Sequence, residues 1–125
     1  MVNANRKGRE GENRLTTFLL MSGYEVELLR LQGVNDPGDL WVPKLDTRIE
    51  MKNHTNIQSA LNEAINDVKK LDERFPLSKN YAVVARAGKA VQDWYAVRRV
   101  GATWPPLIGS ELALFGESID VARAP

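Results

Sequence analysis

The segment 47–52 contains the residues whose types and spacing are best suited to chemistry. Its alternation predicts a β-strand on which Glu50 and Lys52 share one face while Ile49 and Met51 share the other. Asp39 starts a second short predicted strand, and a turn between the two strands would bring its carboxylate close to Glu50. Carboxylates are hard oxygen ligands suited to Mg²⁺, and a neighbouring lysine can orient a water or stabilise charge in phosphodiester hydrolysis. Glu-x-Lys is also common as an exposed ion pair, so this pattern needs support from other residues.

Glu12 is a further acidic candidate. Residues 7–22 have apolar side chains at helical spacing, and Glu12 lies three residues before Leu15 and seven before Leu19, at the edge of the apolar face. An acid in that position is costly unless it is paired or binds a metal. If the helix instead begins later, Glu12 is a first-turn acid that favours the helix dipole.

The elements that must position these residues follow from the periodicity of the chain. Apolar steps of three and four predict helices, and alternation or short apolar runs predict strands. The predicted helices are 7–22, 56–74 and a short one at 110–115, and the predicted strands are 24–31, 39–42, 47–52, 81–87 and 94–100. This order predicts one α/β domain over residues 1–125, with a central mixed β-sheet flanked by helices. Residues 1–6 are expected to form an arm and residues 101–125 a C-terminal extension.

Composition narrows the classes of function. The chain has 125 residues with 43% hydrophobic and 26% charged, as in a single globular domain. A net charge of +1 requires any nucleic-acid surface to be local. The lack of cysteine excludes disulfides, thiolate catalysis and iron–sulfur clusters. We find no Walker loop, GxGxxG or GxSxG, no signal peptide and no membrane-spanning run, so we expect a cytoplasmic protein without a nucleotide cofactor.

Several short motifs, in this order and at this spacing, resemble the PD-(D/E)XK nuclease superfamily. They are Lys7-Gly8, Glu12, Leu15, Leu19, Gly23-Tyr24, Arg30, Gly38-Asp39-Leu40 and Ile49-Glu50-Met51-Lys52. The spacing is most similar to that of Holliday junction resolvases of the archaeal type and their bacteriophage relatives. The resemblance covers about residues 6–100 and implies a restriction-endonuclease-like domain.

The resemblance also implies roles for individual residues. Asp39 and Glu50 would be metal ligands, the backbone carbonyl of Met51 would complete the coordination, and Lys52 would be the catalytic lysine. Glu12 would be a further acid that supports the metal site. The implied cofactor is Mg²⁺, with Mn²⁺ as an alternative.

The sequence departs from the family pattern before the aspartate. The usual proline is replaced by Gly38, with Pro37 one place earlier, and the serine typical of the preceding loop is missing. Asp36 is therefore a rival for the role of Asp39. We prefer Asp39 because residues 40–42 have the pattern of the strand that must carry it.

Basic residues near these motifs are candidates for DNA binding. They are Arg6, Lys7, Arg9 and Arg14 near the N-terminus, and Arg30 and Gln32 before the predicted catalytic turn. A basic segment beside the site can hold phosphates, and the last two residues can touch the scissile strand. The alternative is a solvated, charged surface.

The sequence-based hypothesis is a metal-dependent, structure-selective DNA endonuclease, namely a Holliday junction resolvase that would act in the host cytoplasm if phage-encoded. A flap or restriction-like endonuclease, or a catalytically inactive DNA-binding member, is the alternative. Two symmetric cuts in a four-way junction imply a homodimer. We expect its apolar interface from residues 94–100, 104–106 and 110–115, unless these pack onto the chain's own sheet.

Overall fold

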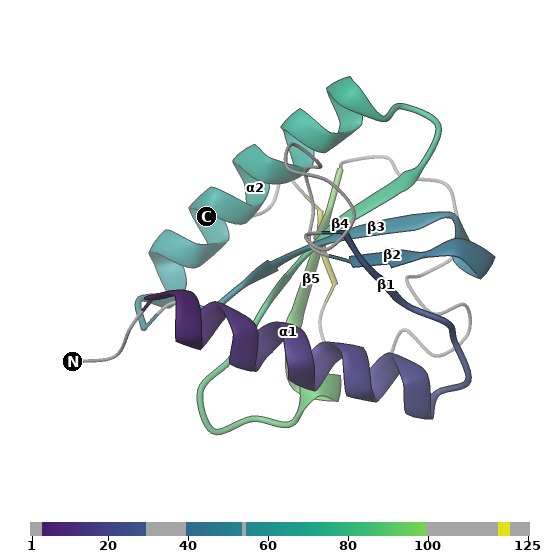
Figure 1. Ribbon diagram of the computed structural model, residues 1–125. Helices are drawn as coiled ribbons and strands as arrows, with labels where there is room; N and C mark the ends of the chain where they lie inside the picture. The colour runs from purple at the N-terminus through teal and green to yellow at the C-terminus, as the bar shows by residue number, and fades with distance from the viewer. Residues whose placement is uncertain (1–3, 30–39, 54, 100–117, 121–125) are drawn as a thin grey trace.

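The computed structural model describes residues 4–29, 40–53, 55–99 and 118–120, with side chains for 9–29, 40–53 and 55–99. Two long helices and a six-stranded sheet make up this part of the chain (Figure 1). The helices are α1 (Ala4–Met21) and α2 (Ile57–Arg74). The strands are β1 (Glu27–Leu28), β2 (Leu40–Val42), β3 (Thr47–Lys52), β4 (Lys79–Val84), β5 (Tyr95–Arg98) and β6 (Ser118–Asp120).

The strands lie in the sheet in chain order, from β1 to β6. The first three form an antiparallel meander, α2 then crosses over, and β4 joins β3 in parallel. β5 is antiparallel to β4, and β6 is parallel to β5. The predicted class, α/β with a central mixed sheet flanked by helices, is confirmed.

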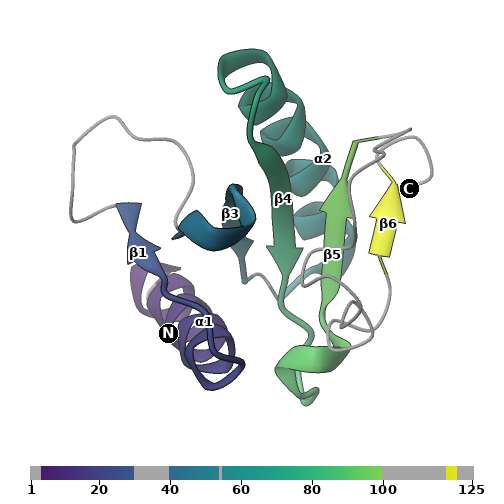
Figure 2. The ribbon, with the colours of Figure 1, turned by 90° about the vertical axis from the view of Figure 1, so that its right-hand side faces the viewer.

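The two helices cover opposite faces of the sheet, as the two perpendicular views show (Figures 1 and 2). Leu15 and Leu19 of α1 pack in one core cluster with Ile49 and Met51 of β3. A second cluster joins α2 to alternate residues of the central strands, with Ala60, Leu61, Ala64 and Val68 against Ala82, Val84 and Val97. Since side chains alternate along a strand, Glu50 and Lys52 lie on the face that α2 covers.

The residues just after α1 and just before α2 form helix caps. Gly23, at φ 95°, follows α1, and the amides of Gly23 and Tyr24 donate to the carbonyls of Leu20 and Leu19 in a Schellman motif. At the start of α2, the Asn56 side chain accepts a hydrogen bond from the Ser59 amide at 3.1 Å. Predicted helix 56–74 therefore agrees with the structure to within one residue.

Several boundaries differ from the prediction. α1 already begins at Ala4, so residues 4–6 belong to a helix rather than to the predicted arm. Within predicted strand 24–31, only Glu27–Leu28 pairs in the described residues. The strand Ser118–Asp120 was not predicted, because three residues are too short for a periodic pattern. Predicted helix 110–115 lies outside the described residues.

The burial of residues in and just before β5 changes the expected dimer surface. Trp94, Ala96 and Val97 are 1% exposed or less and lie within the core clusters of their own domain. These residues therefore pack onto the chain's own sheet and do not supply the apolar interface predicted for 94–100. Residues 104–106 and 110–115 lie outside the described residues.

No helix in the described part of the chain is long and apolar enough to cross a membrane.

Candidate functional site

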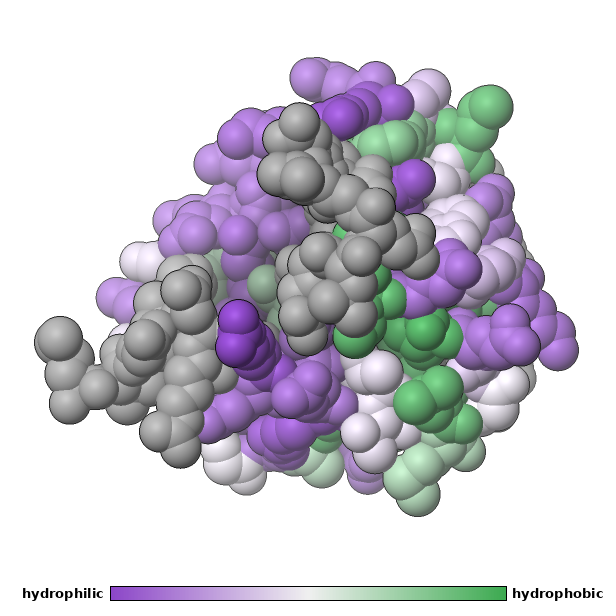
Figure 3. Space-filling model, viewed as in Figure 1, coloured by the Kyte–Doolittle hydropathy of each residue, from purple (hydrophilic) through white to green (hydrophobic). Residues whose placement is uncertain are grey.

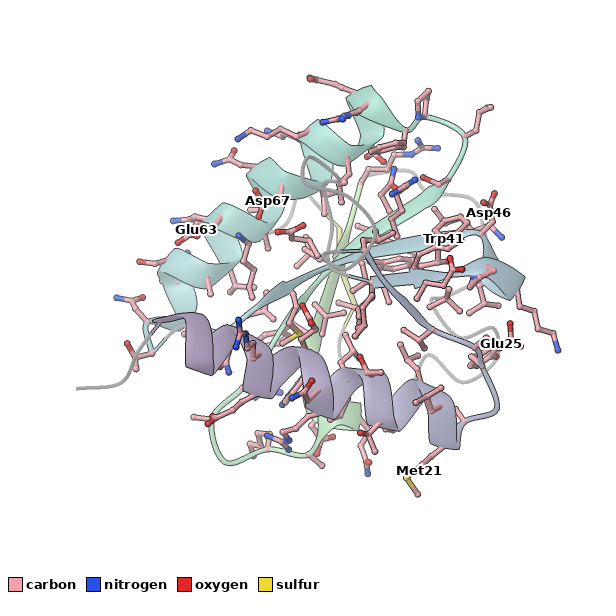
Figure 4. The ribbon with its side chains drawn as sticks, viewed as in Figure 1. Met21, Glu25, Trp41, Asp46, Glu63 and Asp67 are labelled. Carbon is pink, nitrogen blue, oxygen red and sulfur yellow. The ribbon has the colours of Figure 1, made fainter. Side chains whose placement is uncertain are left out.

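Lys52, at the end of β3, faces the acidic side chains of α2. Its Nζ lies 2.5 Å from Asp67 Oδ2 and 3.7 Å from Glu63 Oε1. Glu63 and Asp67 extend from neighbouring turns of α2 (Figure 4). The side chain of Lys52 is 16% exposed, that of Asp67 23% and that of Glu63 48%. The close contact is therefore the better shielded of the two ion pairs.

Glu50 is the third carboxylate near this ammonium, two residues earlier on the same face of β3. Burial lowers the pKa of Lys52, but the hydrogen bond to Asp67 and the attraction of Asp67, Glu50 and Glu63 outweigh it. The net effect raises the pKa of Lys52 above 10.5. Lys52 is therefore a cation at neutral pH, which suits charge stabilisation better than proton abstraction.

The register between β2 and β3 bears on the predicted aspartate. Leu40, the first residue of β2, pairs with Ile49, the neighbour of Glu50. Asp39 precedes Leu40 in the chain, but Asp39 and its rival Asp36 lie outside the described residues. The choice between these two aspartates stays a prediction.

The backbone of β3 also gives a direction for the Met51 carbonyl. The carbonyl of Lys52 accepts a hydrogen bond from the Ala85 amide at 2.8 Å, on the side of β4. Successive carbonyls of a strand point to opposite sides. The Met51 carbonyl therefore points toward the β2 side of β3, the side from which Asp39 is predicted to approach.

The donor set has the chemistry of a site for a hard cation. Glu50 offers a half-buried carboxylate and Met51 a carbonyl oxygen, both ligand types that Mg²⁺ takes together with water. Among the described residues, no three acidic, histidine or cysteine side chains form a metal-binding group. The set of ligands is incomplete without Asp39, so the metal site stays a prediction. The two donors that the structure describes, Glu50 and the Met51 carbonyl, are of the types that Mg²⁺ binds.

Glu12 is buried, with 5% of its surface exposed, near the middle of the 18-residue helix α1. A position so far from the helix start rules out the explanation of Glu12 as a first-turn acid. Its neighbour Gly11 packs closely on β3, because a Cβ there would lie 2.9 Å from Met51 Cε and 3.3 Å from Asn53 Nδ2. The turn of α1 that carries Glu12 thus lies against the residues on either side of Lys52.

The predicted DNA-binding residues have different surroundings. Arg9 is exposed on α1. Arg14 is also exposed, but its Nη2 donates to the Lys89 carbonyl at 3.1 Å and its guanidinium lies 4.8 Å from the Trp94 ring centroid. Arg14 therefore has a structural partner in the free chain.

The remaining DNA-binding candidates are only partly described. Arg6 and Lys7 lie in the first turns of α1, where the structure describes the backbone alone. Arg30 and Gln32 lie outside the described residues. Their contact with DNA stays a prediction.

Sequence reasoning missed Asp67 and Glu63. A usable signal was present, because the two acids are four residues apart and border the apolar stripe of Ala60, Ala64 and Val68. Their relevance depends on α2 crossing over β3, which the helical pattern alone does not reveal.

Comparison of the chain with family models, with curated proteins and with solved structures finds no match.

Proposed function

We propose that this protein is a metal-dependent endodeoxyribonuclease of the PD-(D/E)XK type, most similar in its motifs to Holliday junction resolvases. Its substrate would be four-way DNA, and it would act as a homodimer in the cytoplasm. The observation that carries the proposal is the Glu50–Lys52 pair on one face of β3, with the lysine held charged by Glu50, Asp67 and Glu63.

The order of elements supports the same proposal. A helix, an antiparallel three-stranded meander, a crossover helix and a strand parallel to the third are compatible with a restriction-endonuclease-like domain. In this arrangement α2 lies over the face of β3 that carries Glu50 and Lys52. The candidate residues are thus held by two regular elements rather than by a loop.

The proposed roles combine what the family resemblance implies with the surroundings of the described residues. Glu50, Asp39 and the Met51 carbonyl would hold Mg²⁺, which when bound supplies positive charge at the phosphodiester and a more acidic water. Lys52 would orient the attacking water or stabilise the negative charge of the transition state as a fixed cation. Asp67 would position the Lys52 ammonium through their ion pair.

The proposal is tested by incubating the purified chain with a four-way junction, a flap and a linear duplex of the same sequence, with Mg²⁺ and with EDTA. We expect Mg²⁺-dependent nicks in the junction, placed symmetrically on opposing strands. Preferential cutting of the flap or the duplex would favour the rival nuclease functions. Binding without cleavage of any substrate would favour a catalytically inactive DNA-binding protein.

A further inference from the structure

A second cluster of cationic and aromatic side chains lies on the same face of the sheet, toward the start of β3. The guanidinium of Arg48 lies 3.7 Å from the centroid of the Phe75 ring and 5.2 Å from that of Trp41. These residues line a pocket together with Asp46 and Arg74. Trp41 and Asp46 lie near the end of the sheet away from Glu63 and Asp67 (Figure 4).

Arg48 has unused hydrogen-bonding capacity in this pocket. Its Nε and Nη1 atoms are buried and have no hydrogen-bond partner among the residues that the structure describes. Buried donors of a charged group are normally paired, since leaving them without an acceptor costs free energy. The two aromatic contacts stabilise the flat faces of the guanidinium but supply no acceptor in its plane.

The neighbouring polar groups do not meet this need. Asn80 is opposite Arg48 on β4, but its Nδ2 donates to Asp72 at 2.8 Å and its Oδ1 accepts from Ser78 at 2.8 Å. Asp46 lines the pocket, yet it forms no ion pair with Arg48 in the described part of the chain. Among the described residues, none of these groups therefore serves as an acceptor for Nε or Nη1 of Arg48.

The charge and walls of the pocket indicate the chemistry of the ligand. Arg48 and Arg74 outweigh the single acid Asp46, so the lining is net cationic. A planar guanidinium matches the oxygens of a phosphate, and the rings of Trp41 and Phe75 offer apolar contact to a sugar or base. We propose that this pocket binds a phosphate of the DNA strand and the nucleotide attached to it, a proposal that rests on the nuclease function above.

The position of the pocket fits a nucleotide next to the cleavage site. Arg48, Glu50 and Lys52 alternate along β3 on the face that α2 covers. Two residues of a β-strand advance by about 7 Å, a separation that one or two nucleotides of a DNA strand can span. A DNA strand bound at Arg48 would thus continue toward Glu50.

The binding step is tested without metal and without cleavage, by NMR of the arginine Nε–H groups of the wild-type chain. We titrate with inorganic phosphate and, separately, with a 5′-phosphorylated thymidine dinucleotide. We expect the Arg48 signal to shift with both ligands, and the dinucleotide to bind at least about tenfold more tightly because of the aromatic walls. Arg86 is the internal control, since it stacks on Tyr95 and already donates to the Asp93 carbonyl.

The outcomes are distinct. An Arg48 signal that neither ligand shifts overturns the proposal, and equal affinity for the two ligands overturns its nucleotide part. Loss of dinucleotide binding in Arg48→Gln, with binding retained in Arg86→Gln, supports the proposal. If Arg48→Gln does not fold, the test uses Arg74→Gln, because Arg74 is exposed. This variant should bind the dinucleotide more weakly, and an unchanged affinity counts against the pocket.

The cleavage assay separates this proposal from the nuclease function. If the wild type cleaves DNA, Arg48→Gln should raise KM about tenfold with a smaller effect on kcat. Unchanged KM overturns the pocket but leaves the nuclease function in place. Absence of wild-type cleavage together with a shifted Arg48 signal refutes the nuclease function and leaves the phosphate site in place.

Discussion

Lys52 is held by carboxylates from two elements, Glu50 on its own strand and Asp67 and Glu63 on α2. The alternation of residues 47–52 was enough to predict that Glu50 and Lys52 share a face. The acids of α2 were not predictable from that pattern, because their contact with Lys52 depends on how the helix crosses the sheet. The surroundings of the Arg48 guanidinium could not be predicted from the sequence for the same reason.

Asp67 acts as a positioning residue in this account. Asp67→Asn should slow cleavage about tenfold or more, since a hydrogen bond to a charged group contributes about 1.5–3 kcal/mol. It should also lower the pKa of Lys52, so the alkaline limb of the pH–rate profile should move to lower pH. Glu63→Gln is the matched control, because its contact is longer and more exposed and its loss should change the rate less than about twofold. Equal effects of the two variants would remove the assigned role of Asp67.

The raised pKa of Lys52 has a consequence for stability. Because its pKa in the folded chain lies above 10.5, the stabilisation from its ion pairs is fully present below that pH. It is lost as the pH rises through the higher, folded-state value. The difference in unfolding free energy between wild type and Lys52→Met should stay constant from about pH 7 to about pH 10 and change only at higher pH. Denaturant titrations over this range measure it, and a change near neutral pH would refute the ion pairing.

At the scale of elements, β3 and α2 were predicted best, because a regular pattern of apolar residues extends over the whole of each element. β3 has the predicted bounds, and α2 differs by one residue at its start. β1 was predicted too long and β6 was not predicted, because two or three paired residues carry no periodic signal and their pairing is set by the neighbouring strand. Local sequence thus predicted the elements that hold the site, and tertiary pairing determined the edges of the sheet.

The contact between α1 and β3 gives a prediction at this scale. Gly11→Val should lower the free energy of unfolding by about 1–3 kcal/mol, because the added carbons would press on Met51 and Asn53. Asn13→Val places the same side chain at an exposed position of α1 and is the control for helix propensity. Denaturant unfolding of the two variants measures the difference. Equal stability of Gly11→Val and Asn13→Val would contradict close packing at Gly11.

For the whole molecule, the surface around α2 is mostly hydrophilic in the view of Figure 3, while hydrophobic residues gather on the opposite side of that view. Large exposed apolar side chains in the described residues are Leu20, Met21, Ile57 and Leu77. Since Trp94, Ala96 and Val97 are buried, these three side chains are not available to a homodimer interface.

Dimerisation is a prediction for the full chain. Two symmetric cuts need two sites, and each chain is proposed to carry one, so a twofold dimer should form. Sedimentation equilibrium at micromolar concentration should report about twice the 14.0 kDa mass of the chain. A monomer that nevertheless makes paired, symmetric nicks would contradict the symmetry argument. A monomer that nicks flaps once would favour the flap endonuclease.

The most direct measurement of the central claim is the rate of junction cleavage in Mg²⁺, with enzyme in excess, for the wild type and single substitutions at the site. Glu50→Ala and Lys52→Ala should each reduce the rate about a hundredfold or more while junction binding persists. Lys70→Ala, at an exposed position of α2, is the control and should cleave like the wild type. Asp39→Ala should lose activity and Asp36→Ala should keep it. Full activity of Lys52→Ala would contradict the account.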